Sequence, residues 1–209
     1  MGTEMKTCII FAGGEIYDLS FIDTKADLVI CADRGYIYAE KLGIIPDVIT
    51  GDFDSYTGEL PECTEIYRSV PEKDDTDTML ALKIAIERNC THIRLYGALG
   101  GRFDHAFANI QTLIYAHEHG CKMKICDCDN IITVQGAGTE LYEKYDVWYF
   151  SVFSLTEKLH IEKMTGVKYP LENYTLVQGF PLGVSNEIIS DNAVVSVKKG
   201  TALIVRSRR

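Results

Sequence analysis

The hydrophobic and polar positions of this chain follow one pattern up to about residue 128 and a different one after it. In the first part, short β-branched apolar runs alternate with segments whose apolar residues recur at helical spacing, which predicts parallel βαβ units. The strands are expected at residues 7–12, 27–32, 48–51, 65–70, 93–97 and 122–126. The clearest helices are expected at residues 77–88 and at about 104–118, where Gly120 then stops the second helix.

After Asp129 the helical pattern ends, and alternating runs such as residues 147–152 and 193–197 are separated by Gly, Asn, Asp and Pro. That pattern is typical of an all-β module. The sequence therefore predicts two domains. An α/β domain with a mostly parallel sheet and flanking helices, a Rossmann-like three-layer arrangement, is expected over residues 1–128, and a small β-sandwich over residues 129–209.

Composition narrows the classes of partner. The net charge is -9, and the basic cluster Arg206-Ser207-Arg208-Arg209 is confined to the chain end, so a nucleic-acid partner is not expected. Apolar runs fall short of the about 20 residues that cross a bilayer, and the first residues lack a signal-peptide pattern, so a cytoplasmic protein without a membrane partner is expected. The seven cysteines are odd in number and scattered, which favours reduced thiols.

Ionisable groups directly follow several predicted strands. In an open parallel sheet, ligands bind beyond the carboxyl ends of the strands, so these groups are expected at one rim. They are Asp33-Arg34-Gly35, Gly51-Asp52-Phe53-Asp54-Ser55, Lys73-Asp74-Asp75-Thr76-Asp77 and Gly97-Ala98-Leu99-Gly100-Gly101-Arg102-Phe103-Asp104-His105.

The pair Asp52 and Asp54 indicates a divalent cation. Residues two apart in extended chain point to the same side, so the two carboxylates repel each other unless a cation lies between them. Mg²⁺ prefers carboxylate oxygens together with substrate phosphates, and Asp77 can complete the set. The Gly-rich loop before Arg102 offers backbone N–H groups to phosphate oxygens, and Arg102 adds a forked donor. Together these groups indicate a metal and a polyphosphate.

Simpler interpretations exist for each piece alone. Asp33 fits a helix N-cap, Asp75 or Thr76 can cap the helix that follows, and Arg102 can simply begin a helix. Known phosphate motifs do not match, because the chain has no Gly-Lys pair and no Gly-x-Gly-x-x-Gly. Asp52-Phe53-Asp54 is similar to the Asp-x-Asp of haloacid-dehalogenase-type phosphatases, but Tyr56 stands where that motif has Thr or Val.

Taken in order, the motifs resemble those of the thiamine pyrophosphokinases. The matching pieces are the four acidic or Gly-rich segments above, Pro46-Asp47 before the third of the predicted strands, and, in the β module, Lys168-Tyr169-Pro170-Leu171 and Gly183-Val184-Ser185-Asn186-Glu187. Their order and spacing agree over nearly the whole chain. The resemblance implies an enzyme that transfers a diphosphate from ATP to the hydroxyethyl group of thiamine, giving thiamine diphosphate and AMP.

The resemblance also implies roles for individual residues. It implies Mg²⁺ ligands at Asp52, Asp54 and Asp77, which act in catalysis together with Arg102. It implies nucleotide and phosphate contacts at Asp33, Arg34, Thr76, Arg102, Asp104 and His105, and substrate contacts at Lys73, Asp74, Ser185 and Asn186. It further implies a homodimer with the active site at the subunit interface. Tyr169 or Phe180 is the candidate aromatic to stack on thiamine.

Two other functions remain open from the residues themselves. One is an Asp-x-Asp phosphatase with Asp52 as covalent nucleophile, and the other is a thiamine- or nucleotide-binding module without catalysis. A catalytic base is not assigned, although Asp77 and Asp104 are acids near the expected site. Charge neutralisation and positioning suffice for much of phosphoryl transfer, so a strong base is not required.

Overall fold

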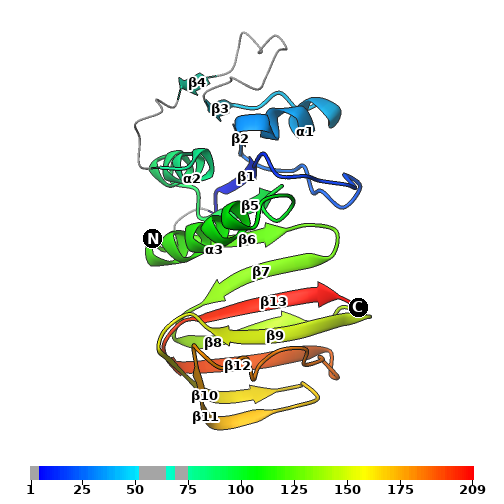
Figure 1. The fold of residues 1–209 in the computed structure, drawn as a ribbon, viewed down its shortest axis with the longest axis vertical. Coiled ribbons are helices and arrows are strands. Elements are labelled where there is room, and N and C mark those ends of the chain that lie inside the picture. Colours follow the sequence, from blue (N-terminus) through cyan, green and yellow to red (C-terminus); the bar gives the residue numbers. More distant parts are fainter. Residues whose placement is uncertain (1–4, 52–64, 69–74) are drawn as a thin grey trace. The chain divides into compact units, whose positions relative to one another are not determined.

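The computed structural model describes residues 5–51, 65–68 and 75–209. The chain divides into two compact units, Met1–Cys128 and Asp129–Arg209, called unit 1 and unit 2 below. The expected fold class, an α/β part followed by an all-β part, is confirmed (Figure 1). Within the described residues, helices that are both long and apolar enough to span a membrane are absent.

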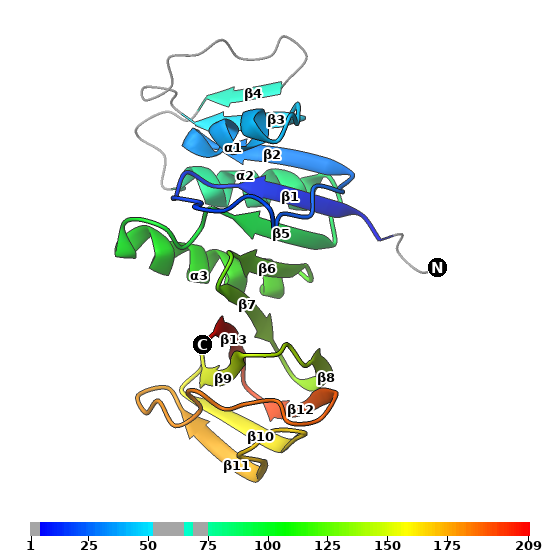
Figure 2. The same ribbon diagram turned by 90° about the vertical axis from the view of Figure 1, so that its right-hand side faces the viewer.

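Unit 1 is built on a parallel sheet with strand order β4-β3-β2-β1-β5-β6, seen as a stack of strands in Figure 2. The strands are β1 Thr7–Phe11, β2 Leu28–Ala32, β3 Val48–Gly51, β4 Glu65–Arg68, β5 His92–Tyr96 and β6 Lys122–Cys126. All five residues of β2 are buried, as expected for a central strand covered on both faces.

The helices of unit 1 pack on this sheet. They are the 3-10 turn η1 Asp33–Gly35 and the helices α1 Tyr36–Lys41, α2 Asp77–Glu87 and α3 Phe103–Glu118. Helix α2 packs on β1, β2 and β3, α3 packs on β6 and α2, and α1 packs on β1 and β2. The expected strands and the two expected helices are confirmed, with shifts of one or two residues at their ends. Residues 69 and 70 of the fourth expected strand lie outside the described residues.

The sequence pattern gave no range for α1. This helix is short, and its buried residues are Tyr36 and Ala39, so it offers too few apolar positions for a periodicity to be recognised. Its place is decided by tertiary packing. The turn before it, at Gly35, lies against the backbone of β1, where a Cβ would stand 2.0 Å from the carbonyl oxygen of Phe11.

Unit 2 consists of two antiparallel sheets. One has the order β7-β13-β9, from β7 Asn130–Gln135, β13 Ala202–Arg208 and β9 Trp148–Ser154. The other has the order β11-β10-β12-β8, from β11 Leu171–Val177, β10 Lys158–Thr165, β12 Asn192–Lys199 and β8 Gly138–Glu143. Alternate residues of β12 are buried, and they meet Phe150, Val152 and Ile204 from the other sheet in one apolar core. Unit 2 is thus a β-sandwich.

We expect Gly35→Ala to lower the free energy of unfolding by about 3 kcal/mol, because the added methyl overlaps the Phe11 carbonyl. The φ of Gly35 is -56°, which alanine also adopts readily. The loss of stability therefore reflects the steric overlap and not an unfavourable backbone conformation. Gly179→Ala is the control, since its Cβ would meet no atom within 4 Å, and its change should stay within about 0.5 kcal/mol. Urea denaturation followed by circular dichroism measures both, and equal stability of the two variants contradicts the expectation.

Candidate active site

A cleft of about 500 Å³ opens in unit 1 at the carboxyl ends of the parallel strands. Its walls are residues 12–15 after β1, 33–34 after β2, 97–98 and 100–102 after β5, and 75–78 at the start of α2. His105 and Asn109 from α3 complete it. This is the position where open parallel sheets bind ligands, and residues at the N-terminal ends of α2 and α3 line it.

The floor of the cleft is made by direct backbone contact between the loops after β1 and β5. The Gly14 N–H donates to the Gly97 carbonyl at 2.9 Å, and the Ala12 N–H donates to the Tyr96 carbonyl at 2.8 Å. A Cβ at Gly14 would lie 2.4 Å from the Gly97 oxygen. Gly97 itself has φ +69°, a conformation that favours glycine.

Gly13 and Gly14 are cleft residues that the sequence analysis missed. The available signal was the Gly-Gly pair directly after the first predicted strand, which stands at a strand end like the acidic segments. The loop is held from a second side by Tyr38, whose hydroxyl donates to the Gly14 carbonyl at 2.7 Å and accepts from the Ile16 N–H at 3.1 Å. Its backbone is therefore fixed before any ligand binds.

Asp33 has an unusual backbone conformation at the rim. Its φ is +51°, in the left-handed region, where a non-glycine residue costs about 1–3 kcal/mol. A Cβ on Gly13 would lie 3.0 Å from the Asp33 Oδ2, so glycine leaves room for this carboxylate. The simple interpretation of Asp33 as a helix N-cap is wrong, because the N-cap positions of η1 and α1 are Ala32 and Gly35.

The start of α2 is held by two hydroxyl groups. Thr76 is the N-cap, and its Oγ1 accepts from the Met79 N–H at 3.1 Å. Thr50, fully buried at the end of β3, donates from its hydroxyl to the Asp77 carbonyl at 3.2 Å. The end of β3 and the first turn of α2 are thereby joined, and Asp77 lies at the cleft.

The Gly-rich loop after β5 is held by a buried side chain of α3. Asn109 is 7% exposed, and its Nδ2 donates to the Ala98 carbonyl at 2.9 Å. Gly100 packs against the loop after β1, since a Cβ there would lie 2.4 Å from the Glu15 oxygen. Asn109 was also missed by the sequence analysis, because a single Asn within a helix carries no local signal.

Arg102 and Asp104 form an exposed ion pair at the mouth of this loop. The Arg102 Nη2 lies 2.5 Å from the Asp104 Oδ2, and the side chains are 72% and 63% exposed. Hydrogen bonding from Arg102 lowers the pKa of Asp104 below its ordinary value. The Asp104 Oδ1 also accepts from the His105 N–H at 3.0 Å. The guanidinium is thus near the cleft but already carries a carboxylate partner.

The predicted site residues of unit 1 fall into two groups, apart from Asp104, which pairs with Arg102 beside the cleft. The structure brings Asp33, Arg34, Thr76, Asp77, Arg102 and His105 together around the cleft. Asp52, Asp54, Lys73 and Asp74 lie outside the described residues. Among the residues that the structure describes, a cluster of three or more His, Cys, Asp or Glu side chains arranged for a metal ion is not found. The carboxylates that line the cleft, which include Asp33 and Asp77, are of the type that Mg²⁺ prefers as a ligand.

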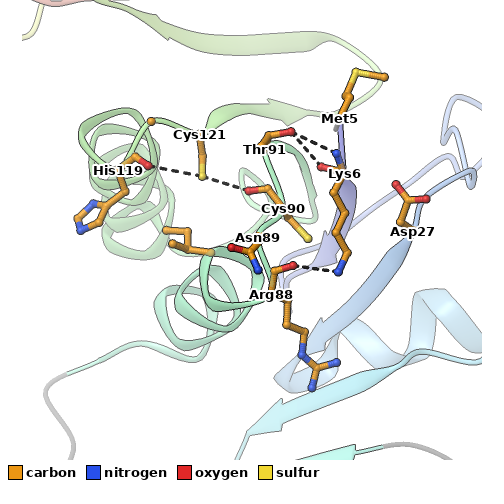
Figure 3. A pocket seen from close by; sticks show the side chains of 11 residues that line it. Met5, Lys6, Asp27, Arg88, Asn89, Cys90, Thr91, His119 and Cys121 are labelled. Atoms are coloured by element: carbon orange, nitrogen blue, oxygen red, sulfur yellow. Dashed lines mark hydrogen bonds between the residues drawn. The ribbon is translucent and has the colours of Figure 1, made fainter. Parts of the chain in front are cut away.

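A second and larger cavity, about 810 Å³, lies at the opposite, amino ends of the strands (Figure 3). Lys6 donates there from Nζ to the Arg88 carbonyl at 2.9 Å, and the Cys121 thiol donates to the Cys90 carbonyl at 3.3 Å. Helices α2 and α3 end beside it, and helix C-termini present carbonyl groups that disfavour a polyphosphate. The smaller cleft therefore has the better chemistry for a phosphate ligand.

Comparison with known proteins identifies the family. The model of the thiamin pyrophosphokinase catalytic domain matches residues 22–125, and that of the thiamin pyrophosphokinase vitamin B1 binding domain matches residues 139–202. The chain is 36% identical over 214 residues to the thiamine pyrophosphokinase of Bacillus subtilis (strain 168), covering 97% of this chain and 99% of that protein. The chain belongs to the thiamin pyrophosphokinase family.

Solved structures agree with this assignment. A thiamine pyrophosphokinase from Bacillus subtilis superposes with a TM-score of 0.89 at 34% identity, covering 98% of this chain and 100% of that one. A thiamin pyrophosphokinase from Geobacillus thermodenitrificans superposes with a TM-score of 0.84 at 32% identity, covering 97% and 98%. Enzymes of the thiamin pyrophosphokinase family transfer pyrophosphate from ATP to thiamine. The comparisons do not support the phosphatase or the non-catalytic binding module.

The predicted thiamine contacts of this family member lie in unit 2. Asn186 is 5% exposed, and its Nδ2 donates to the Tyr169 carbonyl at 2.8 Å while its Oδ1 accepts from the Tyr169 N–H at 3.0 Å. The Asn186 side chain thus holds the backbone of Tyr169, whose own side chain is 60% exposed. Ser185 is exposed with φ +58°, and its N–H donates to the Ser151 hydroxyl at 2.9 Å.

We expect Asn109→Asp to destabilise the protein by about 2–3 kcal/mol, because a carboxylate oxygen replaces the Nδ2 donor and faces the Ala98 carbonyl in a buried place. Gln111→Glu, the same amide-to-carboxylate change at an exposed position of α3, is the control. Thermal unfolding gives the stability, and amide hydrogen exchange in residues 97–102 should accelerate in Asn109→Asp alone. Equal exchange in both variants would show that Asn109 does not hold the loop.

Proposed function

We propose that the cleft of unit 1 binds Mg²⁺ and ATP, and that this chain transfers the terminal diphosphate of ATP to the hydroxyl group of thiamine. The observation that carries the proposal is the meeting of two Gly-rich loops, several carboxylates and the Arg102 region at the carboxyl ends of the strands. Such a place combines donors for phosphate oxygens with acceptors for a cation. Family membership supports the same chemistry.

Backbone N–H groups and helix N-termini would hold the polyphosphate. The loops at Gly13-Gly14 and Gly100-Gly101 are free of side chains, so a phosphate can approach their backbone closely. The N-termini of α2 and α3 add partial positive charge. Arg102 contributes its guanidinium once the ligand competes with Asp104 for it. Arg34, Thr76 and His105, which also line the cleft, are proposed as further nucleotide contacts.

Asp77 would hold the metal together with Asp52 and Asp54, which are proposed ligands outside the described residues. Bound Mg²⁺ supplies charge neutralisation of the transferring diphosphate. The thiamine hydroxyl oxygen forms a bond to the β-phosphorus, and the bond from that phosphorus to the α,β-bridging oxygen breaks. AMP leaves with that oxygen and the bonding electron pair, the proton of the hydroxyl group is released to water, and thiamine diphosphate forms. The chain's part is to align hydroxyl, phosphorus and leaving oxygen, since such transfer depends mainly on positioning.

Unit 2 is proposed to hold thiamine, through Ser185, Tyr169 and the region that Asn186 fixes. Lys73 and Asp74, which lie outside the described residues, are proposed as further substrate contacts. The match of residues 139–202 to a vitamin B1 binding domain supports this role. Tyr169 and Phe180 are 60% and 61% exposed, which leaves either ring free to stack on an aromatic cation. We further propose a cytoplasmic homodimer with the active site at the subunit interface, as the family resemblance implies.

Incubation of the protein with ATP, thiamine and Mg²⁺ should produce AMP and thiamine diphosphate in equal amounts. Separation of the nucleotides by chromatography measures the products, and omission of thiamine is the control. ADP as the nucleotide product contradicts the proposed function, because it would mean transfer of one phosphoryl group. Free phosphate together with an aspartyl-phosphate at Asp52 would instead indicate the phosphatase, and thiamine binding without any turnover would indicate the binding module.

Asp77→Asn should lower turnover by about a hundredfold or more and raise the Mg²⁺ concentration needed for half-maximal rate, because the amide is a weaker cation ligand than the carboxylate. Asn keeps the size of the side chain, and the Thr50 bond goes to the Asp77 backbone, so the fold should persist. Asp146→Asn, whose side chain is 91% exposed in unit 2, is the control. Unchanged Mg²⁺ dependence in Asp77→Asn would remove Asp77 from the metal site.

A further inference from the structure

Asp75 is one of the carboxylates at the cleft, beside Glu15, Asp33 and Asp77, and Lys83 is its cationic partner. The Lys83 Nζ donates to both of its oxygens, at 2.8 Å to Oδ1 and 2.6 Å to Oδ2. The two side chains are 36% and 32% exposed, so the pair is half shielded from water. The sequence offered Asp75 as an alternative to Thr76 for capping the helix that follows, and in the structure the N-cap is Thr76.

Lys83 is well placed to hold this carboxylate. It lies in the middle of α2, and side chains on a helix lean toward its N-terminus, which is where Asp75 lies. Its Nζ also lies 6.0 Å from the centre of the Tyr115 ring on α3, within the range of a cation–π contact. The ammonium group is thus held in place by its own helix α2 and by the Tyr115 ring on α3, and it anchors the segment that precedes the N-cap Thr76.

The charge of Asp75 matters because of what the cleft is proposed to bind. A polyphosphate carries several negative charges, and an uncompensated carboxylate at the same rim repels it. A carboxylate with uncommitted oxygens also competes for the cation that Asp77 is proposed to hold. Pairing with Lys83 cancels the charge of Asp75 and occupies both of its oxygens.

We propose that Lys83 is a positioning residue of this cleft: it holds Asp75 against α2 and cancels its charge, so that the polyphosphate and the cation meet Asp77 and not Asp75. This proposal rests on the proposed function of the cleft as the ATP site. The two partners of the ion pair then have opposite effects on ATP binding. The charge of Asp75 disfavours binding, and Lys83 favours binding only by cancelling that charge.

A double-mutant cycle on the intact protein tests it. The affinity for ATP is measured by calorimetry without thiamine, both with Mg²⁺ and with EDTA, for the wild type, Lys83→Met, Asp75→Asn and the double variant. Lys83→Met should weaken ATP binding about fivefold. Asp75→Asn should bind ATP at least as tightly as the wild type. The double variant should return to within about twofold of the wild type, because the charge that Lys83 cancels is then absent.

Two further variants control for charge and fold. Lys83→Arg keeps a cation beside Asp75 and should retain most of the affinity. Lys122→Met removes the same charge at an exposed position in β6, away from the cleft, and should leave the affinity unchanged. Thermal unfolding of each variant separates a loss of affinity from a loss of fold. If Lys83→Met is too unstable to measure, Lys83→Arg and Asp75→Asn, each compared with the wild type, still test the roles of the two residues.

Distinct results overturn distinct claims. A double variant as weak as Lys83→Met would show that Lys83 acts through its own contacts and not by cancelling Asp75. Weak binding by Asp75→Asn would show that the Asp75 carboxylate is itself needed. Either result contradicts the Lys83 proposal while leaving the proposed function standing. A wild type that binds no ATP under either condition contradicts the proposed function first, and the Lys83 proposal with it.

Discussion

Close contact between the backbones of the loops after β1 and β5 is the constraint on which the cleft depends. The Gly14 N–H meets the Gly97 carbonyl at 2.9 Å, and a side chain at either glycine would overlap a carbonyl oxygen of the opposite loop. Tyr38 and Asn109 then fix one loop each by hydrogen bonds to backbone groups. Glycine is therefore required where these loops meet, because a side chain there would force the two backbones apart.

The acidic rim is compatible with an anionic ligand because some of its carboxylates are paired with cationic side chains. Asp104 shares its charge with Arg102, and Asp75 with Lys83, at distances of 2.5 Å and 2.6 Å. Asp33 is held in a left-handed backbone conformation beside a glycine that leaves room for its carboxylate. A strained residue that persists at a ligand cleft is consistent with a functional requirement, since the surrounding packing must offset its cost.

Much of the fold and part of the site followed from sequence pattern. Alternation of apolar runs with helical periodicity predicted the parallel strands and the helices α2 and α3, because long periodic segments carry a strong signal. The topology rule that ligands bind at the carboxyl ends of strands then placed Asp33, Asp77 and Arg102 at one rim. Helix α1, the Gly13-Gly14 loop and Asn109 were not found, because each owes its position to contacts with segments far away in the chain.

By itself, the sequence determined the order of the elements, the two-part architecture and the acidic segments at the strand ends, since these depend on local periodicity and on general topology rules. The tertiary structure alone decided how individual side chains are used. Asn186 is buried and holds the backbone of Tyr169, Thr76 caps a helix, and Asp75 is neutralised by Lys83. Hydrogen bonds and ion pairs require donor and acceptor atoms to lie within about 3 Å of each other, and no local pattern of residue types encodes such a distance between residues far apart in the chain.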